Sequence, residues 1–222
     1  MFSRLQYWFG NGWMGIADLL ITAFCVFLSL SIHEVAHGFI AYKLGDDTAK
    51  NSGRLSLSPL RHLDPIGALC LFLFGFGWAN PVPVNPRNFD RVKMKTGMVL
   101  TSLAGPASNL IVAFIAAFLM HIVGAFEMNM PLAVIYLLLS NLIVLNIGLA
   151  VFNLIPIPPL DGYKVLSAVL PPRYYFKLMQ YERFGFIILL LIIYIPVFNS
   201  LLSSAVMGIM HFYDFILGFL PF

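Results

Sequence analysis

Apolar runs long enough to cross a lipid bilayer recur along the chain. Residues 14–44, 97–125 and 131–154 are almost continuously apolar, and a fourth apolar stretch occupies residues 184–219. A spanning helix needs about 20 such residues, because each adds ~1.5 Å toward a hydrocarbon core of ~30 Å. The pattern predicts an all-α polytopic membrane protein with about four to six transmembrane helices.

The last of these stretches allows two arrangements. Pro196 interrupts it near the middle and is followed by the polar residues Asn199 and Ser200. A proline inside a helix removes a backbone donor and bends or breaks the helix. The segment therefore predicts either one kinked helix or two shorter ones.

Residues 52–86, between the first two spans, break the helical pattern. The stretch "GRLSLSPL" alternates apolar and polar positions, which is typical of a strand. Residues 66–78 are apolar but too few to span a bilayer, so they predict a re-entrant segment or a buried hairpin. The prolines of "NPVPVNP", residues 80–86, allow only an edge strand or an extended segment. We expect a small membrane-associated β or re-entrant region here.

Composition and charge support a membrane protein. The chain has 222 residues, of which 60% are hydrophobic and 10% charged, and no long polar stretch separates a second domain, so we expect residues 1–222 to form one domain. Apart from Arg4, all the Lys and Arg residues lie in residues 43–95 and 164–183. This is the positive-inside pattern of an integral, multi-pass protein and not a nucleic-acid footprint. We expect both basic segments to face the cytoplasm of a bacterial or archaeal cell, and the 124–131 loop to face outside.

The first span carries "HEVAH", with His33, Glu34 and His37 in its last third. At ~100° per residue, the two imidazoles lie on one helix face with the carboxylate beside them. This is the H-E-x-x-H geometry, in which two ligands hold a metal and the glutamate is a base for a metal-bound water. The alternative is that both histidines form hydrogen bonds to neighbouring helices. Ionisable groups inside a span favour the functional interpretation.

A catalytic zinc usually has three protein ligands, so a third is needed. Asp161 follows the third span in "PIPPLDGY", where broken backbone could line a polar cavity at membrane depth. It could equally be the N-cap of the next helix. The residues alone leave these two alternatives open.

Three motifs, taken in order, resemble the site-2 protease family of intramembrane zinc metalloproteases. They are "HEVAH", "GPASN" at residues 105–109 and "NLIPIPPLDG" at residues 153–162. The resemblance covers nearly the whole chain. The chain resembles a short form of the family, because the sequence has no room for a PDZ or CBS domain.

The resemblance implies a set of roles. His33, His37 and Asp161 would bind one Zn²⁺, and Glu34 would be the catalytic base. Zinc would lower the pKa of its bound water toward ~7, and Glu34 would pass the proton of that water to the leaving amine. Asn109 would assist near the scissile carbonyl, although a mid-helix Asn can also be an interhelical contact. The substrates would be single-span membrane proteins cut within or near the bilayer.

Several residues have competing interpretations. Asn80, Pro81 and Val82 could pair with an unwound substrate by β-addition, or could belong to a proline-stiffened loop. Asn153 is expected to be structural. Tyr163 stands where many family members have a second glycine, a departure that could narrow the site.

Two other classes of function share most of these features. One is a metal transporter or sensor, and the other is an inactive homologue that binds membrane segments. Glu34 favours a protease, because a transporter needs no base beside two histidine ligands. The substrate and the oligomeric state are not encoded in any recognisable pattern.

Overall fold

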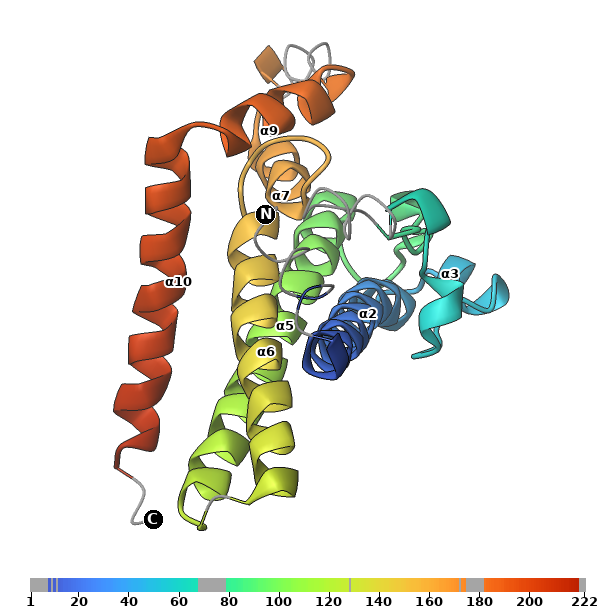
Figure 1. The fold of residues 1–222 in the computed structure, drawn as a ribbon. Helices are drawn as coiled ribbons and strands as arrows, with labels where there is room; N and C mark the ends of the chain where they lie inside the picture. The colour runs from blue at the N-terminus through green and yellow to red at the C-terminus, as the bar shows by residue number, and fades with distance from the viewer. Residues whose placement is uncertain are drawn as a thin grey trace.

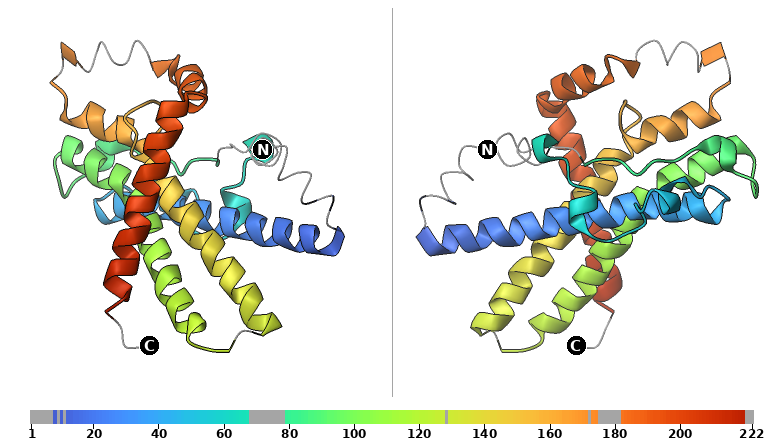
Figure 2. Two further views of the ribbon diagram at one scale, coloured as in Figure 1. Left: turned by 60° about the vertical axis from the view of Figure 1, so that its left-hand side comes forward. Right: turned by 90° about the vertical axis from the view of Figure 1, so that its right-hand side faces the viewer.

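The structure is a computed structural model that describes residues 8, 10, 12–67, 79–127, 129–171, 173–174 and 182–219. Its helices are α2 (Gly12–Lys43), α3 (Thr48–Asn51), the short 3₁₀ helices η1 (Pro59–Arg61) and η2 (Pro86–Asn88), α5 (Met94–Gly124), α6 (Met130–Asn153), α7 (Asp161–Val169), α9 (Gly185–Ile193) and α10 (Pro196–Leu217). They form an all-α molecule in which α5 and α6 run side by side and α2 crosses them (Figures 1 and 2).

Four of the described helices are long and apolar enough to cross a membrane, namely α2, α5, α6 and α10. The first three confirm the predicted spans, with every end within three residues of its expected position. Local chemistry sets these ends. Gly45, just after α2, has φ +107°, a conformation that side chains rarely adopt. The Asn129 side chain accepts a 3.0 Å hydrogen bond from the Leu132 N–H and caps α6.

The C-terminal apolar stretch forms two helices. The chain leaves α9 at Tyr194, and α10 begins at Pro196, a position where proline's missing N–H costs nothing. With nine residues, α9 is only about 13 Å long and cannot cross the bilayer. Figure 1 shows α10 running alongside the α5–α6 pair, against which it packs.

The core lies where the spans meet, and small residues on α5 bring the helices together. Small interface residues let helix backbones approach closely in lipid, and the van der Waals packing that results helps to hold the helices together. The buried cluster consists of Cys25 from α2, Ala113, Ala116 and Ala117 from α5, Leu139, Leu142, Ile143 and Ile147 from α6, and Tyr213 and Leu217 from α10. Large apolar side chains on the outer faces of the spans remain exposed, as expected where lipid contacts the protein.

The β-structure predicted for residues 52–86 is wrong for the part of this region that the structure describes. Only one isolated antiparallel bridge forms there, between Leu63 and Ala79. Pro81 and Pro83 have no N–H to give to a ladder, and the Arg54 guanidinium bonds to the carbonyls of Asn80 and Pro81. The predicted re-entrant segment, residues 66–78, lies almost entirely outside the described residues.

A buried polar contact links α2 to α6. The Asn146 amide, which is fully buried, donates a 2.8 Å hydrogen bond to the Ser29 hydroxyl. We predict that Asn146→Ala lowers the free energy of unfolding by about 0.6–1.7 kcal/mol, because interhelical hydrogen bonds in membranes contribute that much. Reversible unfolding in mixed micelles would measure it. Asn141→Ala is the matched control, because the one side-chain bond of Asn141 to a described residue is with the Leu137 carbonyl of its own helix. Equal losses in both variants would contradict the prediction.

Candidate active site

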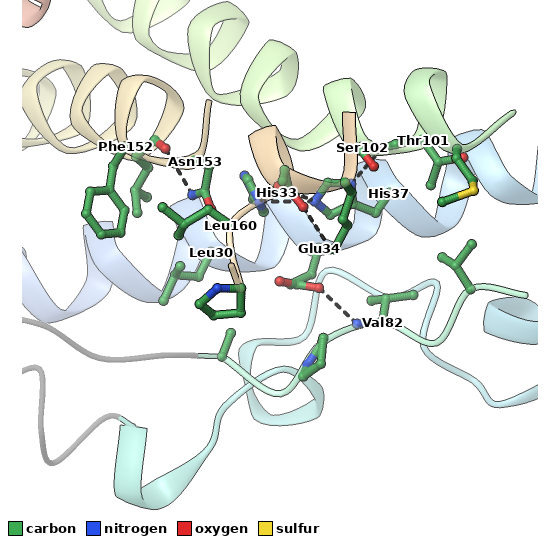
Figure 3. Close-up of a pocket in the computed structure, with 18 of the residues that line it drawn as sticks. Leu30, His33, Glu34, His37, Val82, Thr101, Ser102, Phe152, Asn153 and Leu160 are labelled. Carbon is green, nitrogen blue, oxygen red and sulfur yellow. Dashed lines mark hydrogen bonds and ion pairs between the residues drawn. The ribbon is translucent and has the colours of Figure 1, made fainter. Parts of the chain in front are cut away.

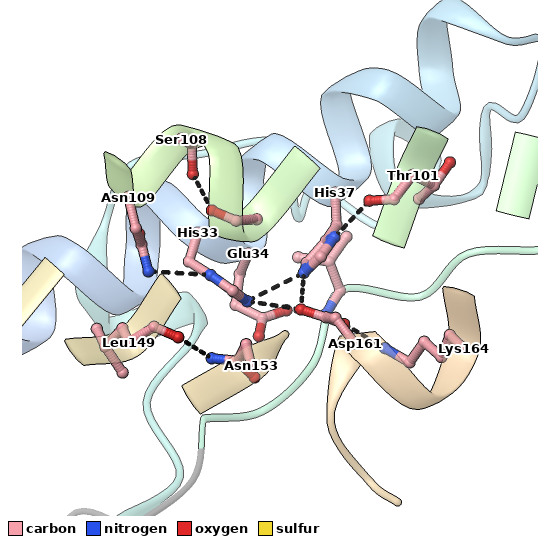
Figure 4. Close-up of polar contacts among 12 residues, drawn as sticks. His33, Glu34, His37, Thr101, Ser108, Asn109, Leu149, Asn153, Asp161 and Lys164 are labelled. Carbon is pink, nitrogen blue, oxygen red and sulfur yellow. Dashed lines mark hydrogen bonds and ion pairs between the residues drawn. The ribbon is translucent and has the colours of Figure 1, made fainter. Parts of the chain in front are cut away.

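The two histidines of the "HEVAH" motif lie on the side of α2 that faces α5 and α7. The His33 and His37 side chains are buried, and their Nε2 atoms lie 3.1 Å apart (Figure 4). The prediction that the i, i+4 spacing brings the two imidazoles together is confirmed.

Asp161 comes to these imidazoles from a different part of the chain. It is the first residue of α7, and the residue before it, Leu160, occupies the N-cap position. Its Oδ2 lies 3.1 Å from His33 Nε2 and 3.0 Å from His37 Nε2. The carboxylate therefore points at the histidines and does not cap the helix.

The arrangement fits a metal ion. One ligand atom from each of His33, His37 and Asp161 can be chosen so that all lie within 4.8 Å of one another, and all three side chains are buried. Two imidazoles and a carboxylate are a donor set that zinc prefers. Gly105 of α5 has no side chain, and this leaves the space beside the histidines open. A Cβ at this position would lie 2.6 Å from His33 Nε2. A bulkier residue at position 105 would therefore fill this space.

The second nitrogen of each imidazole also has a partner. His37 Nδ1 lies 2.7 Å from the Thr101 carbonyl, so it must carry the proton and leave Nε2 as the ligand atom. His33 Nδ1 lies 3.1 Å from the Asn109 amide nitrogen, while the Asn109 Oδ1 is buried without a partner among the described residues. Rotating this amide by 180° lets Oδ1 accept from a protonated Nδ1, which selects the same tautomer.

Asn109 thus contacts His33 on the side of the ring away from Nε2. It is fully buried on α5. The family resemblance implies a position near a scissile carbonyl, with an interhelical contact as the alternative; the structure gives this side chain a contact with the candidate ligand His33.

Lys164 is a further charged group at the site that the sequence analysis did not single out. Its Nζ lies 2.9 Å from Asp161 Oδ1, leaving Oδ2 to face the two histidines. The ammonium balances the carboxylate charge at the edge of the site. A basic residue three positions after Asp161 on a helix was the available signal, because i, i+3 side chains are neighbours.

Glu34 sits beside the cluster and makes a contact that the sequence could not show. Its Oε2 accepts a 2.9 Å hydrogen bond from the Val82 backbone N–H (Figure 3). The carboxylate also lines a cavity of about 470 Å³ that includes His33, His37 and Asp161. The walls are largely apolar and come from α2, α5, α6, α7, α9 and the extended segment around Val82.

The predicted substrate-binding residues divide between the cavity and other contacts. Pro81 and Val82 line the cavity. Asn80 does not line it; its N–H donates to the His62 carbonyl at 2.7 Å and its carbonyl accepts from Arg54. The backbone edge that was expected to pair with substrate is therefore already largely bonded.

The extended segment is fixed by a buried carboxylate at its far end. Asp46 accepts a 2.7 Å hydrogen bond from the Asn85 N–H and a 2.8 Å bond from the Asn88 amide, and it also bonds to Thr48. Burial alone would raise the pKa of the Asp46 carboxyl, but these hydrogen bonds outweigh it and hold the pKa below its usual value.

Asn153 and Tyr163 lie near the site without joining the cluster. The Asn153 amide bonds to the Leu149 carbonyl of its own helix, although its side chain reaches the cavity wall. Tyr163 is buried, and its hydroxyl lies 3.5 Å from Glu182.

Comparisons with known proteins give relatives of one kind. The chain is 46% identical over 172 residues to the Bacillus subtilis protein named "Putative zinc metalloprotease YwhC", a match that covers 76% of this chain and 78% of that protein. It is 30% identical over 192 residues to "Putative zinc metalloprotease Rip2" of Mycolicibacterium smegmatis, covering 84% of this chain and 71% of that protein. It is also 30% identical over 150 residues to "Zinc metalloprotease MJ0392" of Methanocaldococcus jannaschii, covering 67% of this chain and 34% of that protein. No protein-family model matches the chain, and no solved structure matches it at a significant level.

The open space at Gly105 can be tested directly. We predict that Gly105→Ala weakens zinc binding at least as much as the ~10–100-fold that loss of an outer-shell partner costs, because the new methyl group would overlap the space in front of both histidines. Metal content after dialysis against a graded chelator would measure it. Gly148→Ala, on α6 with nothing within 4 Å of the new Cβ, is the control. Equal zinc retention in the two variants would show that zinc binding does not need the open space at Gly105.

Proposed function

Because the chain belongs to the site-2 protease family of zinc metalloproteases, we propose that it is an intramembrane protease, which hydrolyses peptide bonds within or near the transmembrane segments of other membrane proteins. One observation carries the proposal: a three-donor cluster and a carboxylate base share one cavity among the spans of a multi-pass membrane protein. His33 lies ten residues before the basic end of α2 at Lys43, which is about 15 Å along the helix axis. The site would thus lie at the depth of a substrate's transmembrane segment.

The cofactor of this family is Zn²⁺, and we assign His33, His37 and Asp161 as the residues that hold it. Bound there, zinc would polarise a peptide carbonyl and lower the pKa of a bound water toward ~7. The Thr101 carbonyl keeps His37 in the tautomer that exposes Nε2. Lys164 holds one Asp161 oxygen, so that the other faces the two histidines.

Glu34 is the proposed general base. Its Oε2 is held by Val82, and its Oε1 makes no hydrogen bond with any described residue, so one oxygen remains available to take a proton from the attacking water. The same carboxyl would then deliver that proton to the leaving amine.

Asn109 has a contact that supports a positioning role. A side chain bonded to His33 Nδ1 orients the imidazole and fixes its tautomer, as outer-shell partners of metal ligands generally do. We therefore propose that Asn109 acts through His33. A direct contribution at the scissile carbonyl, as the family resemblance implies, would require the amide to leave this contact.

The shape of the cavity suggests the kind of substrate. Its apolar walls suit a membrane segment, and the extended chain around Val82 offers a surface along which that segment could lie after unwinding. We propose single-span membrane proteins as substrates, in regulated intramembrane proteolysis at a cell membrane. The basic segments support an active site open to the cytoplasmic side.

Proteolysis can be tested on the purified protein. We predict that Glu34→Gln lowers kcat for a panel of single-span membrane proteins in liposomes by about 10²–10⁴-fold while zinc content is unchanged, because the base is lost and the ligands are not. Glu127→Gln, on the loop after α5, should cleave like the wild type. A wild type that binds zinc but never cleaves would favour the metal-transport, sensor or scaffold alternatives.

The ligand assignment of Asp161 has its own test. Asp161→Asn keeps the size of the side chain and the start of α7 but removes the charge, so we predict loss of stoichiometric zinc after dialysis. Elemental analysis against an exposed control, Asp90→Asn, would measure it. Full zinc retention in Asp161→Asn would remove this residue from the ligand set.

A further inference from the structure

We propose that the backbone N–H of Val82 positions the general base, by holding one oxygen of the Glu34 carboxylate so that the other faces the reacting water. This inference rests on the proposed function and names a positioning residue that the catalytic motif does not contain. The observation is the 2.9 Å hydrogen bond from Val82 N–H to Glu34 Oε2 across 48 positions of sequence.

Among residues 80–83, only Val82 has an N–H available for this purpose. Pro81 and Pro83 have none, and the Asn80 N–H is already bonded to the His62 carbonyl. The prolines on either side of Val82 also stiffen the backbone, since each fixes its own φ near −65°. A donor flanked by two prolines on a stiff segment is suited to hold a carboxylate in one orientation.

Two clamps fix the segment on either side of this donor. On the N-terminal side, Arg54 donates to the Asn80 carbonyl at 2.6 Å and to the Pro81 carbonyl at 3.1 Å. On the C-terminal side, the fully buried Asp46 carboxylate accepts from the Asn85 N–H at 2.7 Å. Val82 lies between them, so its N–H is placed by the tertiary structure and not by Glu34 alone.

A glycine on α2 lets the segment come this close. Gly38 is one turn after Glu34 and on the same face of the helix. A Cβ at position 38 would lie 2.8 Å from Val82 Cγ1 and 2.8 Å from Leu55 Cδ2. The Val82 side chain is itself buried against the helix, so both its side chain and its backbone hold the segment against the base.

This contact also limits how a substrate can bind. A peptide that pairs with Val82 N–H would have to displace Glu34 from it. If the N–H serves the base, its loss should reduce kcat and leave KM unchanged. If it serves the substrate, its loss should raise KM and leave kcat unchanged.

The contact can first be detected without activity or metal. The chain has three Pro–Val pairs, at Val82, Val84 and Val197, so labelling with ¹³C-carbonyl proline and ¹⁵N-valine isolates these three amides by NMR. We predict that Glu34→Ala moves the amide proton of Val82 upfield, because it loses a bond to a carboxylate. Val84 and Val197 serve as internal references and should stay in place. No movement of Val82, or equal movement of all three, would overturn the inference.

Kinetics then separate positioning from substrate binding. Replacing Val82 by α-hydroxyisovalerate in cell-free translation changes its N–H to an ester oxygen and keeps the side chain. We predict an about 10–100-fold lower kcat with unchanged KM and zinc content, and no further loss in a Glu34→Gln background. The same ester at Val92, whose N–H makes no hydrogen bond in the described part of the chain, is the matched control and should leave both constants unchanged. A raised KM with unchanged kcat, or no effect at all, would overturn the inference.

A side-chain variant gives the same test if the ester does not load with zinc. Arg54→Gln removes the clamp on Asn80 and Pro81 and should lower kcat with unchanged zinc content. Arg87→Gln should leave kcat unchanged. Activity in Arg54→Gln equal to that of Arg87→Gln would count against the inference. Failure of the proposed function would look different. Glu34→Gln would then cleave like the wild type, while Glu34→Ala would still move the amide proton of Val82 upfield.

Discussion

The contact between one Asp161 oxygen and the two imidazoles of α2 is the interaction on which the rest of the structure depends. It brings Asp161 Oδ2 to about 3 Å from the Nε2 atoms of both histidines, although Asp161 and His33 are 128 positions apart in the sequence. The helix bundle around this contact is apolar. For this contact to form, the chain after α6 must turn sharply, α7 must begin at Asp161, and α5 must present Gly105 to the cluster. The prolines of residues 156–159 end one helix, and the aspartate starts the next at the point where its carboxylate reaches α2.

A second constraint follows from the first, because polar groups in a bilayer must find partners inside the protein. The histidines meet this constraint with both ring nitrogens, one toward the ligand cluster and one toward Thr101 or Asn109. Away from the site, Asn146 and Ser29 meet it by bonding across two helices. The same contacts that satisfy these groups therefore also hold α2, α5 and α6 in a fixed relation, so the stability of the bundle and the geometry of the site have a common origin.

The segment around Val82 connects the cluster of His33, His37 and Asp161 to the place where substrate is proposed to lie. It is extended, largely bonded on its own account, and held by Arg54 and Asp46. Glu34 accepts a hydrogen bond from this segment, at Val82, and lies on the side of the donor cluster, as Figure 3 shows. Base, donor cluster and segment thus all line the cavity, and α6 and α9 supply mostly apolar lining residues.

The sequence by itself determined the spans and the core of the site. Long apolar runs have only one stable form in lipid, so α2, α5 and α6 could be placed to within three residues, and the i, i+4 spacing sufficed to pair His33 with His37. The same local rules were wrong about the described part of residues 52–86, because alternation of apolar and polar side chains predicts a strand only where a neighbouring segment can offer N–H groups, and prolines and Arg54 prevent that here. The resemblance of motifs, and not periodicity, selected Asp161 over its alternative as a helix cap. Only the tertiary structure decided that Asn109 contacts His33 and that Val82 bonds to Glu34. These contacts depend on where separate segments meet in space and on single backbone or side-chain atoms, which leave no periodic pattern in the chain.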